Sequence, residues 1–259
     1  MATSRKLVRK IILSVALLAV SSWATSVSAP AAPVPAARFA TGITYNYLGG
    51  YLYKAPVEDL AFNTHGINAF FTYAPLTSIN LGVDLGMRDV NMEKGIYGFN
   101  GRFGIAAGSH LKFATPYFGD VMGLVAMCRG LWFYSEDQFN TYYSGRELTS
   151  AGGLSFHVQR VGYISFGAKY LEIFGENGYG LEKGKWSNDA TLGGWIAFDF
   201  FPRTDIKQYI PFISFEFGFF PNDKPFYGGN PVLRNASFGI TIGGITRRLY
   251  GNTDENWRP

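Results

Sequence analysis

Seven side chains that could bind ions, select solutes or transfer protons sit beside apolar residues in an alternating pattern. Asp84, for example, lies between Val83 and Leu85. Because successive side chains of a β-strand point to opposite faces, such residues are expected on the polar face of strands. Charges of both signs on one enclosed face either pair with each other or form a selective constriction. The seven candidates are Asp84, Arg88, Arg102, His157, Lys169, Asp199 and Glu216.

Catalysis needs a constellation of groups, and the sequence offers only fragments of one. His157 and Ser155 lie two residues apart, so they share one strand face, but no acidic partner is close in sequence. We therefore expect His157 to be a hydrogen-bonded histidine on an inner face. A second histidine, His65, follows acidic residues at 58 and 59, without a recognisable motif. No phosphate-binding loop, paired Cys/His spacing or dinucleotide fingerprint is present, so no catalytic residue, metal or cofactor is predicted.

The element around which these residues are organised is the stretch 79–87, INLGVDLGM. Its odd positions are all apolar, and its even positions are polar or small. This alternation predicts a strand with one apolar and one polar face. Residues 63–74 alternate in the same way, and the four residues between the two stretches, 75–78, predict a tight turn. The pair is expected to form a long hairpin.

Similar alternation recurs to the end of the chain. It predicts about ten strands, within a range of eight to twelve, near 39–48, 63–74, 79–87, 96–107, 121–134, 152–159, 163–174, 189–201, 209–219 and 235–249. In 121–134 the alternation is blurred, which a bulge or a strand apolar on both faces would explain. The segment 108–120 is expected to be a long turn or an extra short strand. Repeated long alternating strands predict an all-β, transmembrane, antiparallel up-and-down β-barrel.

Composition favours the same class of protein. Of 259 residues, 17% are aromatic and 16% charged, below the roughly 25% charged residues of soluble domains. Residues 1–26 combine a basic start, a short apolar run and small residues, which predicts a secretory signal peptide. We expect a Pro/Ala-rich periplasmic linker over 27–37, the barrel over 38–250 and a polar tail over 251–259. This organisation predicts the cell outer membrane of a Gram-negative-type cell, reached through the periplasm.

Charge and cysteine content exclude other classes of protein. The chain has 23 Lys and Arg against 19 Asp and Glu, but four of the basic residues lie in the predicted signal peptide. The mature chain is then close to neutral, so no nucleic-acid partner is expected. The single cysteine, Cys128, excludes an internal disulfide and is expected to be a small buried or lipid-facing residue.

Loop lengths and strand parity predict which end of the barrel faces outward. An even strand number keeps both termini on one side, expected to be periplasmic. Five longer connections then face outward, at 49–62, 88–95, 135–150, 175–188 and 221–234, and shorter ones at 75–78, 160–162 and 202–208 face inward. Two of the outer connections carry aromatic and polar residues suited to contacting sugars or proteins. The loop-binding candidates there are Tyr142, Tyr143, Phe226 and Tyr227.

The chain resembles the small bacterial outer-membrane β-barrels of the OmpA or OmpW kind, over most of 38–250 and as architecture alone. One departure is that nine residues follow Tyr250, whereas such proteins commonly end on an aromatic residue. The resemblance implies outer-membrane lipid, both lipopolysaccharide and phospholipid, and the outer-membrane assembly machinery as partners. The predicted function is a non-enzymatic barrel, either a narrow porin-like pore or a structural envelope component. The alternatives are an outer-membrane hydrolase of lipid A deacylase or protease type, and a surface adhesin or receptor.

Overall fold

The computed structural model describes residues 37–54, 57–76, 78–91, 103–115, 118, 121–136, 140–158, 161–179, 182–187, 191–201, 209–221 and 233–247. The predicted signal peptide, most of the linker and the polar tail lie outside these residues. Among the described residues, no helix has the length and hydropathy of a membrane span.

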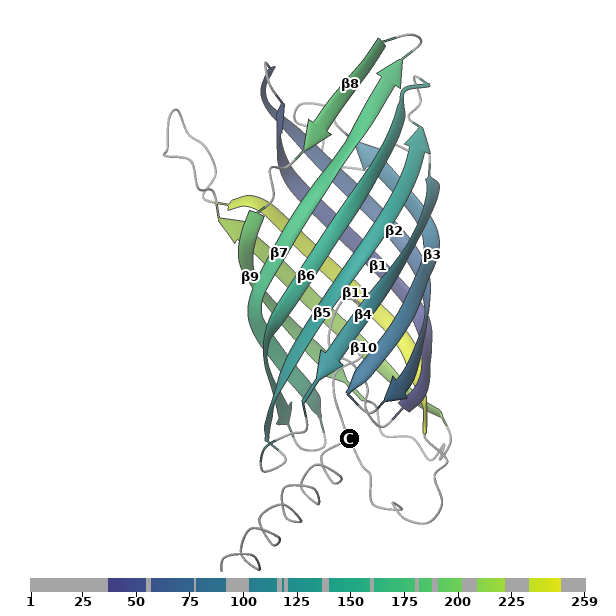
Figure 1. Ribbon diagram of the computed structural model, residues 1–259, viewed down its shortest axis with the longest axis vertical. Coiled ribbons are helices and arrows are strands. Elements are labelled where there is room, and N and C mark those ends of the chain that lie inside the picture. The colour runs from purple at the N-terminus through teal and green to yellow at the C-terminus, as the bar shows by residue number, and fades with distance from the viewer. Residues whose placement is uncertain are drawn as a thin grey trace, which may run out of the picture.

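Nearly all described residues belong to antiparallel β-strands (Figure 1). The first six are β1 (Ala37–Lys54), β2 (Val57–Leu76), β3 (Ile79–Asn91), β4 (Gly104–Ala114), β5 (Met122–Glu136) and β6 (Tyr142–Val158). The others are β7 (Gly162–Tyr179), β8 (Glu182–Ser187), β9 (Thr191–Phe200), β10 (Tyr209–Pro221) and β11 (Leu233–Arg247).

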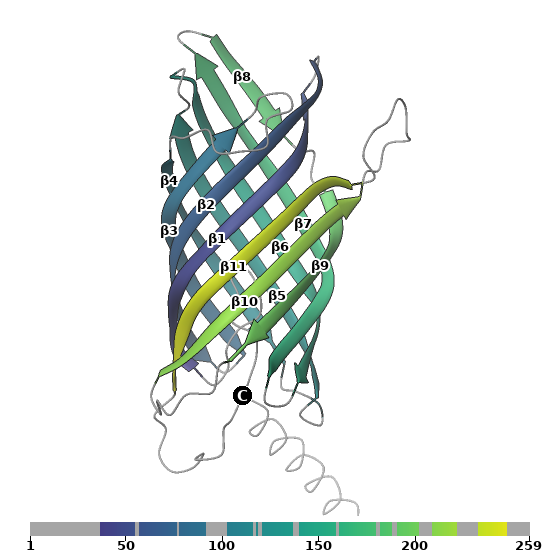
Figure 2. The same ribbon diagram turned by 180° about the vertical axis from the view of Figure 1, so that it is seen from behind.

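Ten of these strands close a barrel. Each pairs with its neighbour in the order β1 to β7, then β9, β10 and β11, and β11 pairs back to β1 over 37–50. β1 begins and β11 ends at the same end of the barrel, drawn as the lower end in Figures 1 and 2. The predicted ten-stranded antiparallel up-and-down barrel is confirmed.

The short strand β8 continues the path of β9 toward the upper end. Phe174 of β7 lies opposite Ser187, and Leu171 lies opposite Thr191, so the β8–β9 path holds one extra residue against β7. Ser187 also pairs with Tyr53 of β1. Above the ends of β10 and β11, β8 therefore takes their place in the wall and pairs with β1. Figure 2 shows β8 above the ends of β10 and β11.

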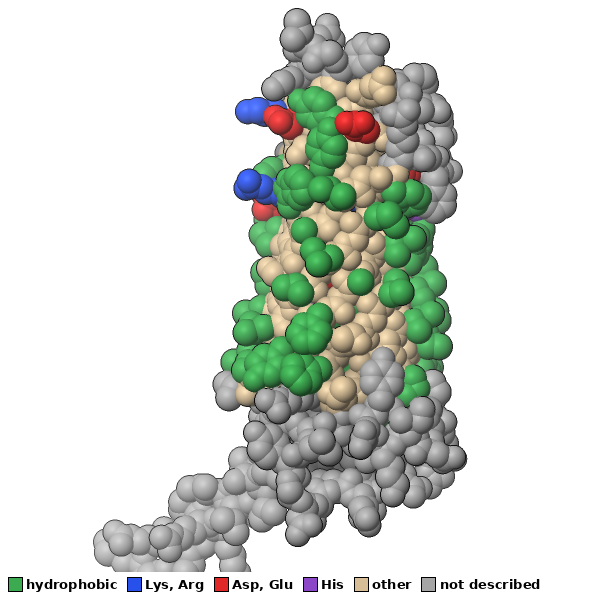
Figure 3. Space-filling view, turned by 90° about the vertical axis from the view of Figure 1, so that its right-hand side faces the viewer, with side chains coloured by type: hydrophobic (Ala, Val, Ile, Leu, Met, Phe, Trp, Pro, Cys, Tyr) green, Lys and Arg blue, Asp and Glu red, His purple; other side chains and the backbone are tan. Residues whose placement is uncertain are grey.

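The outer surface carries a belt of apolar side chains. On β3 every outward residue from 79 to 87 is apolar, and Leu85 is 63% exposed; residues 88–91 of the same strand are all buried. On β7 the outward residues from 162 to 170 are uncharged, and Glu172 follows. The belt is thus about as tall as the 9–11 tilted residues with which a strand crosses a bilayer. Figure 3 shows charged side chains gathered near the upper end of one face, among hydrophobic ones that continue down the wall.

The lumen holds two apolar layers with charged side chains between them. We call the cluster Leu48, Val90, Ala106, Leu131, Phe133, Tyr143, Leu171, Ile173, Trp186 and Phe220 the upper apolar layer. The cluster Ala40, Phe70, Tyr163, Phe201, Ile210, Phe212 and Ile245 is the lower apolar layer. A third cluster, Ala114, Val125, Trp195 and Ala197, extends the lower layer toward β4 and β5. A barrel of this size is narrow enough for its own side chains to fill.

The turn between β6 and β7 requires a glycine at position 162. Gly162 has φ of 148°, and a Cβ at this position would lie 1.7 Å from the carbonyl oxygen of Asp199. Only glycine combines that backbone angle with so close an approach to β9. The tight turn predicted at 160–162 is confirmed by the hydrogen bond from Val161 N to Val158 O, 3.0 Å.

The predicted end of the fourth strand was wrong. β4 runs over Gly104–Ala114, so the first half of the segment expected to be a long turn or an extra short strand continues this strand, with His110 and Lys112 inward and Leu111 and Phe113 outward. The predicted blur in the fifth strand is resolved in favour of a strand apolar on both faces. β5 pairs without a register shift with β4 and with β6. Its inward residues Val125, Leu131 and Phe133 belong to the apolar clusters of the lumen.

Three predicted outer loops were also wrong. The strands continue past the membrane belt, so most of 49–62, 135–150 and 175–188 belongs to β1 and β2, to β5 and β6, and to β7 and β8. Among the described side chains of 140–147 and 172–179, both faces carry polar and aromatic groups, because neither face lies in lipid. The extensions therefore lack the alternation by which the buried parts of the same strands are recognised.

Candidate functional site

The lumen between the two apolar layers contains four acidic and four basic side chains among the described residues. All eight are at most 9% exposed, and His110 lies with them. The acids are Asp84, Glu147, Asp199 and Glu216, and the bases are Arg88, Lys112, Arg129 and Lys169. We call these eight residues and His110 the charged layer. With equal numbers of acids and bases, ion pairing can compensate for the loss of hydration.

The uppermost pair joins opposite walls of the barrel. Arg88 Nη2 on β3 donates to Glu147 Oε2 on β6. Thr149 Oγ1 donates to the other carboxylate oxygen, Oε1, at 3.3 Å. The Arg88 guanidinium also lies 5.5 Å from the centroid of the Phe133 ring, which belongs to the upper apolar layer. This pair therefore links the charged layer to the apolar layer above it.

A second group of charged-layer residues has the connectivity of an acid–base–hydroxyl relay. Asp84 Oδ2 lies 2.8 Å from His110 Nδ1, and His110 Nε2 lies 3.0 Å from Thr72 Oγ1. Arg129 Nε is 3.5 Å from the same Asp84 oxygen. An imidazole held between a carboxylate and a hydroxyl is the arrangement by which hydrolases activate a nucleophile.

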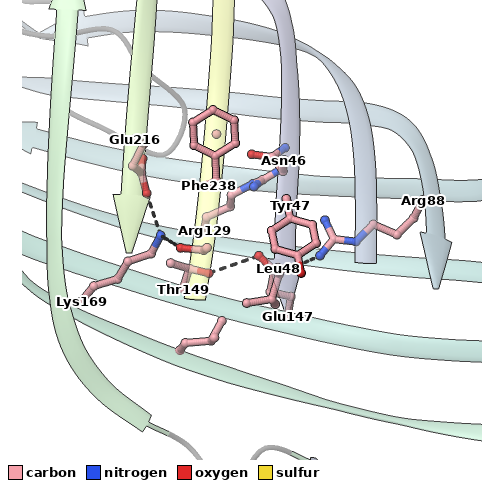
Figure 4. A pocket seen from close by; sticks show the side chains of 13 residues that line it. Asn46, Tyr47, Leu48, Arg88, Arg129, Glu147, Thr149, Lys169, Glu216 and Phe238 are labelled. Atoms are coloured by element: carbon pink, nitrogen blue, oxygen red, sulfur yellow. Dashed lines mark hydrogen bonds and ion pairs between the residues drawn. The ribbon is translucent and has the colours of Figure 1, made fainter. Parts of the chain in front are cut away.

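The remaining pairs connect β7, β9, β10 and β11. Lys169 Nζ donates to Glu216 Oε1 at 2.6 Å and to Ser237 Oγ at 3.1 Å. Figure 4 shows Lys169 pointing toward Glu216, and Arg88 toward Glu147, from different walls. The hydroxyl of Ser214 donates to Asp199 Oδ1. The pairs thus cross-link strands that are far apart in the sequence.

A small cavity lies among these pairs. Its volume is about 30 Å³, and Asn46, Arg88, Arg129, Glu147, Lys169 and Glu216 contribute to its lining. Such a volume holds on the order of one or two water molecules, and no organic substrate. The lining does not include His110 or Thr72, so this cavity offers no space in which a substrate could meet the relay. Within the described part of the chain, no three His, Cys, Asp or Glu side chains converge to hold a metal ion.

The relay depends on a glycine that makes room for the imidazole. A Cβ at Gly82 would lie 1.9 Å from His110 Nε2 and 2.3 Å from Cε1. We predict that Gly82→Ala displaces His110 from Thr72 and Asp84 and lowers the free energy of unfolding by about 1–3 kcal/mol, the usual cost of overpacking. Urea unfolding of the protein folded in phospholipid vesicles measures this change.

The matched control for this prediction is Gly130→Ala. At Gly130, which faces outward, nothing lies within 4 Å of an added Cβ. Its stability is therefore expected to stay within about 0.5 kcal/mol of the wild type, as for most surface changes. Equal losses for the two variants would show that the effect is not caused by the imidazole.

The structure places five of the seven residues singled out from the sequence in the charged layer. Asp84, Arg88, Lys169, Asp199 and Glu216 are all buried there. His157 lies apart from them near the lower end, half-buried, with its ring 4.9 Å from that of Tyr163. Arg102 lies outside the described residues. What these side chains do remains a prediction.

Four members of the charged layer were missed from the sequence. His110 and Lys112 lay in the segment expected to be a long turn or an extra short strand, although they alternate with Leu111 and Phe113. Glu147 lay in a predicted loop. Arg129 lies in a strand that is apolar on both faces, where no pattern distinguishes its inner face.

Two of the loop-binding candidates are not in a loop. Tyr142 and Tyr143 open β6. Tyr143 is 6% exposed and belongs to the upper apolar layer, so it cannot contact an external ligand. Tyr142 faces outward and lies next to Tyr134. Phe226 and Tyr227 lie outside the described residues.

Comparison with known proteins gives a likeness of fold without a family. No family model and no curated protein matches the chain. Among solved structures it is similar to the outer membrane protease OmpT from Escherichia coli, at 12% identity and a TM-score of 0.42, over 81% of this chain and 96% of that one. It is also similar to the translocator domain of the autotransporter NalP from Neisseria meningitidis, at 10% identity and a TM-score of 0.41, over 79% and 87%.

A third similar structure is an outer membrane channel from Pseudomonas putida F1. The identity is 9% and the TM-score 0.42, over 86% of this chain and 99% of that one. At such identities and TM-scores the likenesses concern the fold alone.

Proposed function

We propose that this protein is a closed, non-conducting β-barrel of the outer membrane that serves as a structural component of the envelope. The observation that carries the proposal is the filled lumen. The upper and lower apolar layers lie on either side of a charged layer whose acids and bases are equal in number. An ion crossing this barrel would have to displace both layers and separate buried pairs, at a cost of several kcal/mol for each.

The predicted signal peptide and the apolar belt support the location. A Gram-negative-type outer membrane accommodates β-barrels that arrive through the periplasm, with short turns at the periplasmic end. In this arrangement the lower end, where β1 begins and β11 ends, faces the periplasm (Figure 1). The upper extensions of β5, β6, β7 and β8 then stand at the cell surface. Folding would involve the outer-membrane assembly machinery and outer-membrane lipids as partners.

A hydrolase is the weaker candidate. The Asp84–His110–Thr72 relay has suitable hydrogen bonds, but all three side chains are at most 4% exposed, and the described cavity does not reach His110. General base catalysis requires a reacting atom within hydrogen-bond reach of the base. The relay is better explained as the hydrogen bonding that a buried histidine and carboxylate need.

Single-channel recording tests the proposal. The full-length protein without its signal peptide, folded in detergent and checked by heat-dependent gel mobility, is expected to insert into planar bilayers without discrete conductance steps. Steps in the wild type would overturn the closed-barrel proposal and make the charged layer a selectivity site.

A variant designed to open the lumen serves as the comparison if the wild type shows no conductance steps. Phe133→Ala with Phe212→Ala removes a large fully buried ring from each apolar layer. If these layers seal the lumen, vesicles containing the double variant leak small ions faster than those containing the wild type. Equal leakage would show that the seal lies elsewhere in the barrel.

A further inference from the structure

The outer face of β5, β6 and β7 changes character at one level. Below it, the outward residues of all three strands are uncharged, from Met122 to Gly130, from Val158 to Leu148 and from Gly162 to Tyr170. Above it, each of the three strands carries charged outward residues: Glu136 on β5, Arg146 on β6, and Glu172 and Glu176 on β7. The change marks the height at which the wall leaves the hydrocarbon of the bilayer.

Aromatic and charged side chains are interleaved just above this level. In the strand register Trp132 lies opposite Arg146, Tyr134 opposite Ser144, and Glu136 opposite Tyr142. On the other side of β6, Ser144 pairs with Glu176, which pairs with Lys185. We call Trp132, Tyr134, Glu136, Tyr142, Arg146 and Glu176 the rim patch.

The rim patch has a defined internal geometry. The rings of Tyr134 and Tyr142 are almost parallel, at 9°, with centroids 6.3 Å apart. The Tyr134 hydroxyl donates to Glu136 Oε1 at 2.7 Å. Trp132 is 40% exposed, and Glu136, Arg146 and Glu176 are exposed. The rings are thus held side by side, next to hydrogen-bonding groups that water can still reach.

This chemistry fits saccharides. Flat aromatic faces pack against the apolar C–H faces of sugar rings, while carboxylates accept from, and a guanidinium donates to, their hydroxyl groups. An anionic phospholipid headgroup fits less well, because Glu136, Glu172 and Glu176 outnumber the bases Arg146 and Lys185 on this face. The patch therefore favours a ligand recognised mainly through hydroxyl groups.

The position of the patch selects the source of the sugar. It begins where the apolar belt ends, so its ligand lies at the membrane surface. We propose that the rim patch binds the saccharide headgroup of a glycolipid in the outer leaflet of the membrane. The proposal rests on the outer-membrane location proposed above, but not on whether the lumen is closed.

Titration with a lipid-free oligosaccharide tests the proposal. The folded protein in detergent, checked by heat-dependent gel mobility, is titrated with the dephosphorylated core oligosaccharide released from outer-membrane glycolipid, and binding is followed by calorimetry. We expect saturable binding that Tyr142→Ala weakens about tenfold, through loss of aromatic packing. Arg146→Gln is expected to weaken it about tenfold as well, through loss of a charged hydrogen-bond donor.

The matched control is Phe166→Ala, an exposed aromatic of the apolar belt on β7. Its affinity for the oligosaccharide is expected to equal that of the wild type. Absence of saturable binding by the folded wild type, or equal weakening by Phe166→Ala, would overturn the proposal. So would tighter binding to vesicles of anionic phospholipid than to vesicles containing the glycolipid.

Failure of this inference can be distinguished from failure of either part of the proposed function. Cell fractionation decides whether the protein resides in the outer membrane, and conductance decides whether the lumen is closed. A conducting barrel that binds the oligosaccharide would retain this inference and overturn only the closed lumen. A barrel without conductance that binds no oligosaccharide would retain the closed lumen and overturn this inference.

Discussion

Removing the carboxylate of Glu147 is expected to lower the free energy of unfolding by about 3–5 kcal/mol, because a buried charge then loses its partner. Arg88 is 1% exposed, and Glu147 Oε2 accepts a hydrogen bond from its Nη2. In Glu147→Ala the guanidinium keeps its ring contact with Phe133 but loses the carboxylate that it contacts in the wild type. Urea unfolding in phospholipid vesicles, followed by tryptophan fluorescence, measures the loss.

The double variant Arg88→Met with Glu147→Leu distinguishes the effect of losing the ion pair from the effect of losing the volume that the two side chains fill. Both replacements are apolar and similar in length to the originals, so no buried charge is left uncompensated. We expect the double variant to be more stable than Glu147→Ala, as buried ion pairs replaced by apolar residues often cost nothing. A single variant within about 1 kcal/mol of the wild type would mean that water reaches Arg88 from the cavity.

The membrane-spanning part of the fold could be predicted from the sequence because lipid imposes a strict rule on it. Each outward residue from 79 to 87 must be apolar, while inward residues need only fill the lumen. The two faces of β3, β7 and β10 therefore differ enough for period-two alternation to reveal them. The same rule explains the blurred alternation at β5, whose inward residues Val125, Leu131 and Phe133 are apolar because they belong to the sealing layers.

The upper extensions could not be predicted by that rule. On β6, Tyr142, Ser144 and Arg146 face outward while Tyr143 and Glu147 face inward, so both faces mix aromatic and polar groups. Such a stretch has the composition of a loop. Its strand structure comes from pairing with β5 and β7, which a pattern within one strand does not record.

Which acid pairs with which base in the charged layer also depends on how the barrel closes. Glu147 lies 59 residues from Arg88, and Glu216 lies 47 residues from Lys169. Alternation indicates that a charge faces inward, but which opposite charge it meets depends on the shear and tilt of the closed barrel. The sequence thus predicts the residue types of this layer better than their partners.

The apolar belt leads to the second large effect, which concerns a charge in lipid. Leu85 lies near the middle of the belt on β3 and is 63% exposed on the outer surface. An arginine there would have to remain in hydrocarbon or distort the bilayer to reach water. We expect Leu85→Arg to lower the free energy of unfolding in vesicles by about 2–4 kcal/mol, the cost of arginine at the midplane of a bilayer.

Leu148→Arg is the matched control, because it makes the same exchange at the upper edge of the belt. Leu148 faces outward on β6, two residues from Arg146, and is 37% exposed. At this height an arginine reaches the headgroups, so a loss of about 0–1 kcal/mol is expected. If both variants lost the same stability, or if Leu85→Arg cost nothing, the belt would not lie in hydrocarbon. The boundary on which the rim patch is placed would then be wrong as well.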